Sequence, residues 1–420
     1  MDNDALLNLA AEIGCRLTLC GAETFRVEES VVRILGTYGV EASAYAIPNC
    51  LHISIRTDSG RYYSCMHRIE EYSTDMDSLE LLSGLSRRIC EEHPQLPQAR
   101  QWLDEIGSSH LTYHPAVSYL GNFLAGWGFS LFFGANLPEA VCGGFCAMIA
   151  GFMDGLLKKI RVNRFVRTMI AAFLFAFPAF TLESAGLLAN ADMAIVGALM
   201  PLIPGLMFTN AMRDIIHGDM HASMIRLSYV LLLALGIAAG VSLALHGATA
   251  LWGDRPYSAA APVAISLQLF ACFVACTGFS IIFQVHGRGF LLCPAGGVLT
   301  WLVCTVLASG GYPEYICYLV AAACAAAYAE IMARLRRCPA TAFLVIGLVP
   351  LIPGAGLYNT MLYAVNGNPQ AGLEKGMQTL IIAAVMAVGV ILVSTTIRTY
   401  HTVFGKHPTL PGEKTGSRRQ

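Results

Sequence analysis

Two nearly identical stretches decide how the chain is organised. Residues 201–205 read Pro-Leu-Ile-Pro-Gly, and residues 350–354 read Pro-Leu-Ile-Pro-Gly again; we call each a PLIPG motif. An asparagine follows each glycine five residues later, at Asn210 and Asn359, so the offset is constant at 149 residues (350 − 201 = 149). Both motifs lie inside long apolar runs, where proline removes a backbone donor and interrupts a helix. Helices broken at corresponding positions of two halves are typical of a transport site.

The composition indicates an integral membrane protein. Of 420 residues, 55% are hydrophobic and 13% are charged, with a mean hydropathy of +0.56, whereas soluble domains carry about 25% charged residues. The net charge of −1 gives no field that would attract nucleic acid. The fourteen cysteines form no CxxC pair and no zinc-finger spacing, so we expect no redox centre, no bound metal and no cofactor.

Apolar runs of roughly 20 residues, the length that a spanning helix needs, follow one another from residue 113 onward. The first five fall near 115–133, 137–157, 166–185, 192–212 and 223–245. The second five fall near 261–285, 289–309, 313–333, 340–362 and 374–397. We therefore expect an α-helical membrane protein with about ten transmembrane helices. Its expected parts are an N-terminal domain (1–110), two five-helix repeats (111–250 and 258–400) and a polar C-terminal tail (401–420).

The two halves match at more than the PLIPG motif. Gly128-Phe129-Ser130 recurs as Gly278-Phe279-Ser280, and Gly143-Gly144 recurs as Gly296-Gly297. Because each half has five spans, the second half must enter the bilayer upside down, which makes an inverted repeat. Loops rich in lysine and arginine alternate with loops poor in them, so the positive-inside rule puts both termini in the cytoplasm.

Residues 1–110 carry much of the charge and no stretch long enough to span a bilayer. Helical periodicity predicts four helices, over 6–19, 24–38, 75–92 and 98–106. Alternating segments predict three short strands, over 42–47, 51–56 and 61–65. The first residues lack the basic start of a signal peptide, so we expect a small α+β domain in the cytoplasm.

The chain resembles the bacterial threonine/serine exporter family at two features. One is Cys20-Gly21-Ala22-Glu23-Thr24-Phe25-Arg26-Val27-Glu28-Glu29, and the other is the pair of PLIPG halves after an α+β domain. Some relatives divide the protein into two subunits, and this chain resembles the fused form. The resemblance implies secondary export of threonine and serine, or of dicarboxylates such as succinate in divided members, driven by the membrane potential or the proton gradient.

The resemblance also suggests a role for three charged residues of the N-terminal domain. Glu23, Arg26 and Glu28 would dock this domain onto the membrane domain or control access to it. The alternative is that they form a solvated helix face.

Substrate-binding candidates centre on the two motifs. A helix that restarts after Gly205 or Gly354 presents free N–H groups and a positive dipole end, which suit a carboxylate. Asparagines one to two turns further on could recognise an amine or a hydroxyl. The predicted site comprises Pro201, Pro204, Gly205, Asn210, Pro350, Pro353, Gly354, Tyr358 and Asn359. The alternative is that proline and glycine only kink two packed helices.

Three carboxylates are candidates for proton coupling or gating. Glu183 and Glu330 occupy near-corresponding positions in the two halves, and an ionisable residue within a membrane is a functional hypothesis by default. The alternative is that each lies near a helix end, where Glu330 would pair with Arg334 at i+4 spacing. Asp154 is the weaker candidate, because Lys158 lies four residues on.

The chain has no GxSxG, HExxH or P-loop motif, so we do not expect an enzyme or an ATP-driven pump. The sequence predicts a secondary exporter of small polar carboxylates, above all threonine and serine, driven by the proton gradient in the bacterial inner membrane. Its partners would be the substrate, protons and the lipid bilayer; a homo-oligomer stays open. One alternative is a dicarboxylate exporter, which should need a cation; we expect none near either motif. The other alternative is a membrane sensor with the N-terminal domain as its output module.

Overall fold

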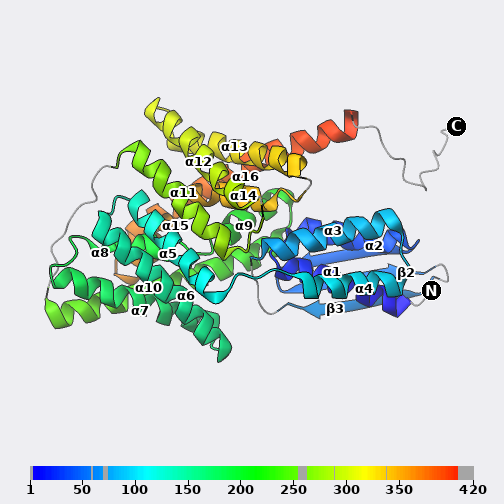
Figure 1. The fold of residues 1–420 in the computed structure, drawn as a ribbon, viewed down its shortest axis with the longest axis horizontal. Coiled ribbons are helices and arrows are strands. Elements are labelled where there is room, and N and C mark those ends of the chain that lie inside the picture. The colour runs from blue at the N-terminus through cyan, green and yellow to red at the C-terminus, as the bar shows by residue number, and fades with distance from the viewer. Residues whose placement is uncertain are drawn as a thin grey trace.

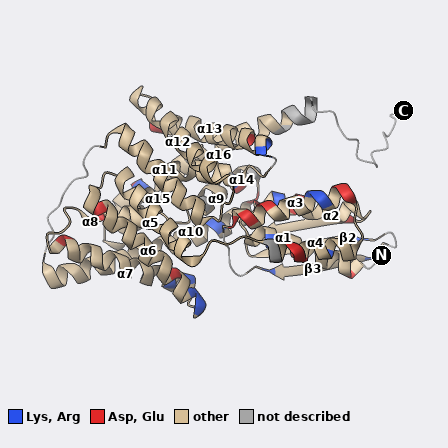
Figure 2. Ribbon diagram, viewed as in Figure 1, with Lys and Arg blue, Asp and Glu red and all other residues tan. Residues whose placement is uncertain are grey.

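The computed structural model describes residues 3–57, 60–69, 74–253, 263–287, 289–336 and 338–404. Most of the tail expected over 401–420 lies outside these residues. Figure 1 shows an N-terminal domain of helices and strands beside a larger bundle of helices. Figure 2 shows charged residues over the N-terminal domain and near the ends of several helices of the bundle.

The N-terminal domain packs helices against a small antiparallel sheet. Its elements are α1 (Asn3–Leu19), α2 (Thr24–Thr37), β1 (Glu41–Ile47), β2 (Cys50–Arg56), β3 (Tyr62–Arg68), α3 (Met76–Glu92) and α4 (Leu96–Ser109), with strand order β1-β2-β3. Alternate residues of β2, namely Leu51, Ile53 and Ile55, are fully buried. A β-carbon on Gly14 of α1 would lie 2.6 Å from Leu51 and 2.8 Å from Val31. The glycine therefore lets α1 approach both the sheet and α2 closely.

The rest of the described chain is helical. The first part holds α5 (Pro115–Phe132), α6 (Leu137–Lys159), α7 (Arg164–Ser184), α8 (Ala191–Leu199), α9 (Gly205–His217) and α10 (Met220–Trp252). The second part holds α11 (Ile265–Ile282), α12 (Gly289–Ser309), α13 (Glu314–Arg336), α14 (Thr341–Leu348), the 3-10 turn η1 (Val349–Leu351), α15 (Gly354–Val365) and α16 (Pro369–Phe404). The two runs that contain a PLIPG motif are each broken into two shorter helices.

Seven helices among the described residues are long and apolar enough to cross a membrane: α6, α7, α10, α11, α12, α13 and α16. The segment Thr341–Leu351 and α15 together make an eighth, if this pair, bent by 51°, counts as one span. Helix α5 and the broken pair α8–α9 fall outside this set. By length and composition, the chain is therefore an α-helical membrane protein with seven or eight candidate spans.

The helices of the two parts pack in corresponding pairs. In the first part α10 packs on α7 and on α9, and in the second α16 packs on α13 and on α15. The parts also exchange contacts, since α9 packs on α16 and α15 packs on α10. The helices that follow the two motifs therefore each bridge to the other half.

The crossing of α5 and α11 is built on glycine. A β-carbon on Gly128 would lie 2.6 Å from the backbone nitrogen of Ala275, and one on Gly278 would overlap that of Ala125. Small residues allow helix backbones in a membrane to approach this closely. Gly128 of α5 faces Ala275 of α11, and Gly278 of α11 faces Ala125 of α5. The two glycines are 150 residues apart (278 − 128), and so are the two alanines (275 − 125), so each glycine meets the corresponding position of the opposite helix. Reciprocal contacts of this kind are those of surfaces related by a two-fold axis.

Candidate functional site

The two PLIPG motifs form the same turn. Pro204 has φ −77° and ψ 51°, and Pro353 has φ −76° and ψ 50°. The N–H of Gly205 donates to the carbonyl of Ile203 at 2.8 Å, and that of Gly354 to Ile352 at 2.7 Å. These are inverse γ-turns with proline at the centre, where its fixed φ is already suitable. The break in each helix therefore follows from the local sequence.

The two turns lie against each other. A β-carbon on Gly205 would overlap Cγ2 of Ile352, the isoleucine of the other motif. A β-carbon on Gly354 would lie 3.4 Å from Cδ1 of Ile203 and 3.4 Å from Sδ of Met200. The isoleucine of each motif therefore packs near the glycine of the other, and the contact at Gly205 is the tighter one.

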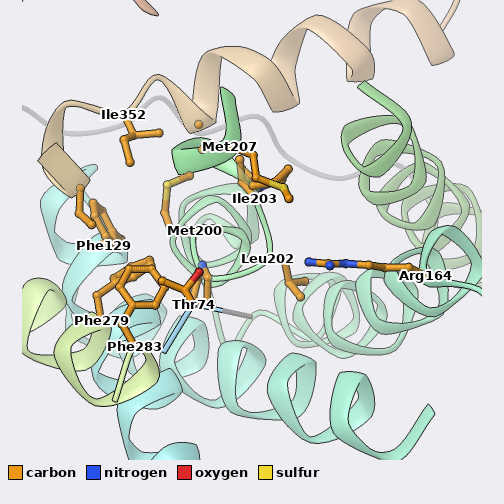
Figure 3. Close-up of a pocket in the computed structure, with 15 residues that line it drawn as sticks. Thr74, Phe129, Arg164, Met200, Leu202, Ile203, Met207, Phe279, Phe283 and Ile352 are labelled. Atoms are coloured by element: carbon orange, nitrogen blue, oxygen red, sulfur yellow. The ribbon is translucent and has the colours of Figure 1, made fainter. Parts of the chain in front are cut away.

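A cavity of about 150 Å³ lies between the two motifs. Residues 201–205 line one side, and Val349, Ile352 and Gly354 line another. Phe129, Phe279 and Phe283 gather along one wall in Figure 3, and the rings of Phe129 and Phe279 meet edge to face at 5.9 Å. Most of the wall is apolar, which excludes water around any polar ligand.

Arg164, the first residue of α7, supplies the one ionisable side chain among the residues that line this cavity. Figure 3 shows it extending toward Leu202, on the far side from the phenylalanine rings. Its guanidinium lies 5.2 Å from the centre of the Tyr229 ring and has no carboxylate partner among the described residues. Thr74, from the N-terminal domain, also lines the cavity.

The expectation that no cation lies near either motif is therefore wrong. Arg164 precedes Pro201 by 37 residues, and only the packing of α7 brings it to the cavity. A second cation, Arg213, donates to the side chain of Asn210 at 3.1 Å.

The nine predicted substrate-binding residues do not all meet at this cavity. Pro201, Pro204, Gly205 and Gly354 line it, whereas Pro350, Pro353, Tyr358, Asn210 and Asn359 are not among its lining residues. Tyr358 is buried and Asn359 is partly buried. Asn210 lies with Arg213 on a different face of α9, beside a second and smaller cavity. The two asparagines are therefore not joined at one place.

The candidate coupling carboxylates lie at three separate places. Glu183 is 5% exposed and accepts a hydrogen bond at 3.1 Å from the N–H of Ala191, at the start of α8. Glu330 pairs with Arg334 at 3.5 Å, and Asp154 pairs with Arg167 of α7 at 2.7 Å.

The N-terminal domain contacts the helical bundle through the start of α2. Glu23 pairs with Arg213 at 3.1 Å, and Arg26 donates to Thr341 of α14 at 3.2 Å. Thr24 accepts from Arg226, which also donates to Asp214 at 2.9 Å. Sequence reasoning singled out Glu23 and Arg26 but missed their two partners in the bundle, Arg213 and Thr341, because residues about 190 to 315 positions apart share no local pattern.

Glu28, by contrast, faces its own domain. It accepts a hydrogen bond at 2.8 Å from the N–H of Ala46 in β1. Burial raises the pKa of the Glu28 carboxyl above its usual range; the Ala46 N–H opposes this shift and the Asp219 carboxylate adds to it.

A second contact joins the domain to the end of α11. The N–H of Met76 donates to the carbonyl of Phe283 at 2.9 Å. The hydroxyl of Tyr113 donates to the carbonyl of Val285 at 2.7 Å, and the Tyr113 ring stacks on His286 at 4.2 Å. The N-terminal domain therefore also contacts the bundle at Phe283, which lines the same cavity as Thr74.

Comparison with known proteins identifies the family. The family described as "Putative threonine/serine exporter" matches residues 8–247, and that described as "Threonine/Serine exporter, ThrE" matches residues 268–396. The "Probable threonine/serine exporter" of Mycobacterium tuberculosis (strain ATCC 25618 / H37Rv) is 23% identical over 339 residues, which are 78% of this chain and 64% of that protein. The "Threonine/serine exporter" of Corynebacterium glutamicum is 24% identical over 405 residues, which are 92% of this chain and 81% of that protein. This chain thus spans less than two thirds of the mycobacterial protein.

No solved structure matches. Because the first family match alone covers more than half of the sequence, the chain belongs to the threonine/serine exporter family.

Proposed function

We propose that the protein is a secondary active exporter of threonine, serine or related small carboxylates, with the cavity between the PLIPG motifs as its central binding site. The observation that carries this proposal is the meeting of the two broken helices at one cavity with a single cation, Arg164. Membership in an exporter family favours transport over the sensor alternative and over any enzyme activity.

The chemistry of the cavity suits a carboxylate. The Arg164 guanidinium would bind the carboxylate by charge-assisted hydrogen bonds, and the starts of α9 and α15 add positive helix ends from two directions. Carbonyl groups released where the helices break would accept from the ammonium or hydroxyl group of the substrate. The apolar wall around Phe129 and Phe279 strengthens these interactions by excluding water.

The proposed architecture is a pair of inverted five-helix repeats, with ten crossings and with both termini and the N-terminal domain in the cytoplasm. The reciprocal contacts of Gly128 and Gly278 support it, as do the shared turns at Gly205 and Gly354. In such a repeat protein, alternating access is a rocking of one helix group against the other around a fixed site. The N-terminal domain would then lie over the cytoplasmic side of the site.

For the driving force, we propose that protons load Glu183 and Glu330, with Asp154 as a further candidate. Glu183 is buried at the end of α7, where it accepts from the start of α8, and Glu330 holds a partly exposed pair with Arg334. Because neither carboxylate lines the cavity, coupling would act through helix movement rather than through direct contact with the substrate.

One observation favours a second candidate function, the export of dicarboxylates. Arg164 supplies a cation at the cavity between the motifs, which is what a dicarboxylate site should need. Counterflow in proteoliposomes against a panel of threonine, serine and succinate tests both functions. Exchange of threonine and serine supports the first, exchange of succinate alone supports the second, and no exchange of any carboxylate contradicts both.

A further inference from the structure

A second polar position lies beside α9, on the face that carries Asn210 and Arg213. These two residues, with Thr341 of α14 and Glu23 of the N-terminal domain, line a cavity of about 30 Å³. Arg213 is shared between two partners there: it pairs with Glu23 at 3.1 Å and donates to Asn210 at 3.1 Å. The side chains of Glu23 and Arg213 are only 7% and 11% exposed, so this ion pair is largely removed from solvent.

The ion pair of Arg213 depends on the N-terminal domain. Within the helical bundle Arg226 pairs with Asp214 at 2.9 Å, whereas the carboxylate that pairs with Arg213 is Glu23 of the N-terminal domain. Arg26 lies 3.4 Å from Glu23, on its more exposed side. A buried charge that loses its partner is strongly unfavourable. If α2 moves away, another anion must therefore take the place of the Glu23 carboxylate.

The groups around the Glu23 carboxylate would suit a free carboxylate equally well. The Arg213 guanidinium donates charge-assisted hydrogen bonds, the Asn210 amide has N–H groups to donate, and the Thr341 hydroxyl can donate while it accepts from Arg26. The space now left, about 30 Å³, holds no more than a water molecule. Glu23 must therefore leave before a ligand can enter.

This position is separate from the cavity between the motifs. Arg213 follows Gly205 by eight residues, which is about 12 Å along a helix. A small amino acid cannot bridge that distance, so the two positions would hold their ligands one at a time or independently.

We propose that Asn210, Arg213 and Thr341 form a second carboxylate-binding site, on the side of the bundle that the N-terminal domain covers, and that Glu23 occupies it as an internal substitute for the ligand. The ligand class is a small monocarboxylate such as an α-amino acid; its identity as the transported molecule rests on the proposed function. The docked N-terminal domain and a bound carboxylate then exclude each other at this site.

The test is equilibrium binding to the purified full-length protein in nanodiscs, with threonine, serine and threoninol, the analogue that lacks the carboxylate. Glu23→Ala removes the carboxylate that occupies the site, so the form with an unoccupied site is no longer a minor population. Threonine and serine should therefore bind about tenfold more tightly to this variant. Binding of threoninol should not change. The matched control is Glu29→Gln, on the same helix, where the carboxylate pairs with Arg33 instead; it should behave as the wild type does.

The gain must also depend on the proposed site. Arg213→Gln combined with Glu23→Ala should abolish it. Asn210→Leu, which keeps every charge, should reduce it in the same background and serves if the arginine variant does not fold. Unchanged or weaker binding in Glu23→Ala, or a gain that persists without Arg213, overturns the proposal. If wild-type vesicles show no flux while the gain and its dependence on Arg213 are observed, the site stands and the transport function fails.

Discussion

Ile352 lies directly over Gly205, whereas its counterpart Ile203 stays 3.4 Å from the place where a β-carbon on Gly354 would lie. The two motifs have the same sequence and nearly the same backbone angles, yet their contacts differ in tightness. The structure is therefore one asymmetric arrangement of two equivalent parts. If the repeats exchange their conformations during transport, Gly354 should become the tight position in the opposite state.

This asymmetry predicts unequal effects at the two glycines. Gly205→Ala should strongly impair counterflow, because its methyl group overlaps Ile352 in this state, while Gly354→Ala should be milder because 3.4 Å is an ordinary contact distance. Gly354→Val should abolish transport while the protein still reaches the membrane. Gly155→Ala, where no atom lies within 4 Å of the added carbon, is the matched control. Normal flux in Gly205→Ala and Gly354→Val would reduce the motifs to helix kinks.

The second prediction concerns Arg164. Arg164→Gln should weaken carboxylate binding by about tenfold to a hundredfold, since hydrogen bonds to charged groups contribute about 1.5–3 kcal/mol. Arg164→Lys should retain part of the affinity, because it keeps the charge but loses the planar fork of donors. Substrate concentration series in counterflow measure this. Arg161→Gln changes an exposed arginine in the connection just before α7 and controls for the loss of a nearby positive charge. Equal effects of both substitutions would remove Arg164 from the site.

The third prediction separates coupling from binding. Glu330→Gln should retain substrate exchange but lose export driven by a pH gradient, whereas Asn359→Ala should weaken exchange itself. Glu183→Gln should behave as Glu330→Gln does, because its amide oxygen can still accept from Ala191. Counterflow and gradient-driven flux are compared side by side, with the exposed Glu374→Gln as control. If Glu330→Gln still follows the gradient, or Asn359→Ala exchanges normally, this division of roles is incorrect.

The fourth prediction follows from the raised pKa of Glu28. A carboxyl whose pKa is higher in the folded state binds more protons there than in the unfolded state, so its contribution to stability declines as pH rises. The decline should begin near the unfolded pKa of about 4.3 and end above the folded pKa. Apparent unfolding temperature against pH should therefore have a more positive slope over this window in Glu28→Gln than in the wild type, and this variant can still accept from Ala46. A slope equal to that of the wild type contradicts this reading.

The fifth prediction tests the proposed topology. Single cysteines at Asp254 and Gly412, both outside the described residues, should label from opposite sides of the membrane. This follows from five crossings between them and cytoplasmic termini. Labelling of both from the same side would contradict the arrangement of five plus five helices.

Local features of the fold could be predicted from the sequence. The breaks at Pro204 and Pro353 follow from the missing N–H group and fixed φ of proline, which act within a few residues. The strands of the N-terminal domain begin and end within three residues of their predicted bounds, because their alternating burial is also local. The number of spans does not follow from local pattern in the same way, since α5 and the pair α8–α9 are short or moderately polar next to the other helices.

The site could be predicted only in part. Asn210 follows Gly205 by five residues, which turns its side chain by about 140° around the helix axis, so a position near the motif in sequence faced another cavity. Arg164 and the pair of Glu23 with Arg213 depend on long-range packing. A single sequence contains no periodic signal for such contacts.

The glycine-lined crossing of α5 and α11 also has a consequence for synthesis. Gly278 emerges from the ribosome 150 residues after Gly128, which takes roughly 8–30 s at 5–20 residues per second. In the proposed architecture of ten crossings, α5 is then in the membrane with its glycine face uncovered. Because the crossing is reciprocal, the natural temporary partner of this face is α5 of another nascent chain. A ribosome stalled before Ile265 would therefore leave a half-protein that pairs with itself, and the order of translation decides whether the crossing forms within one chain or between two.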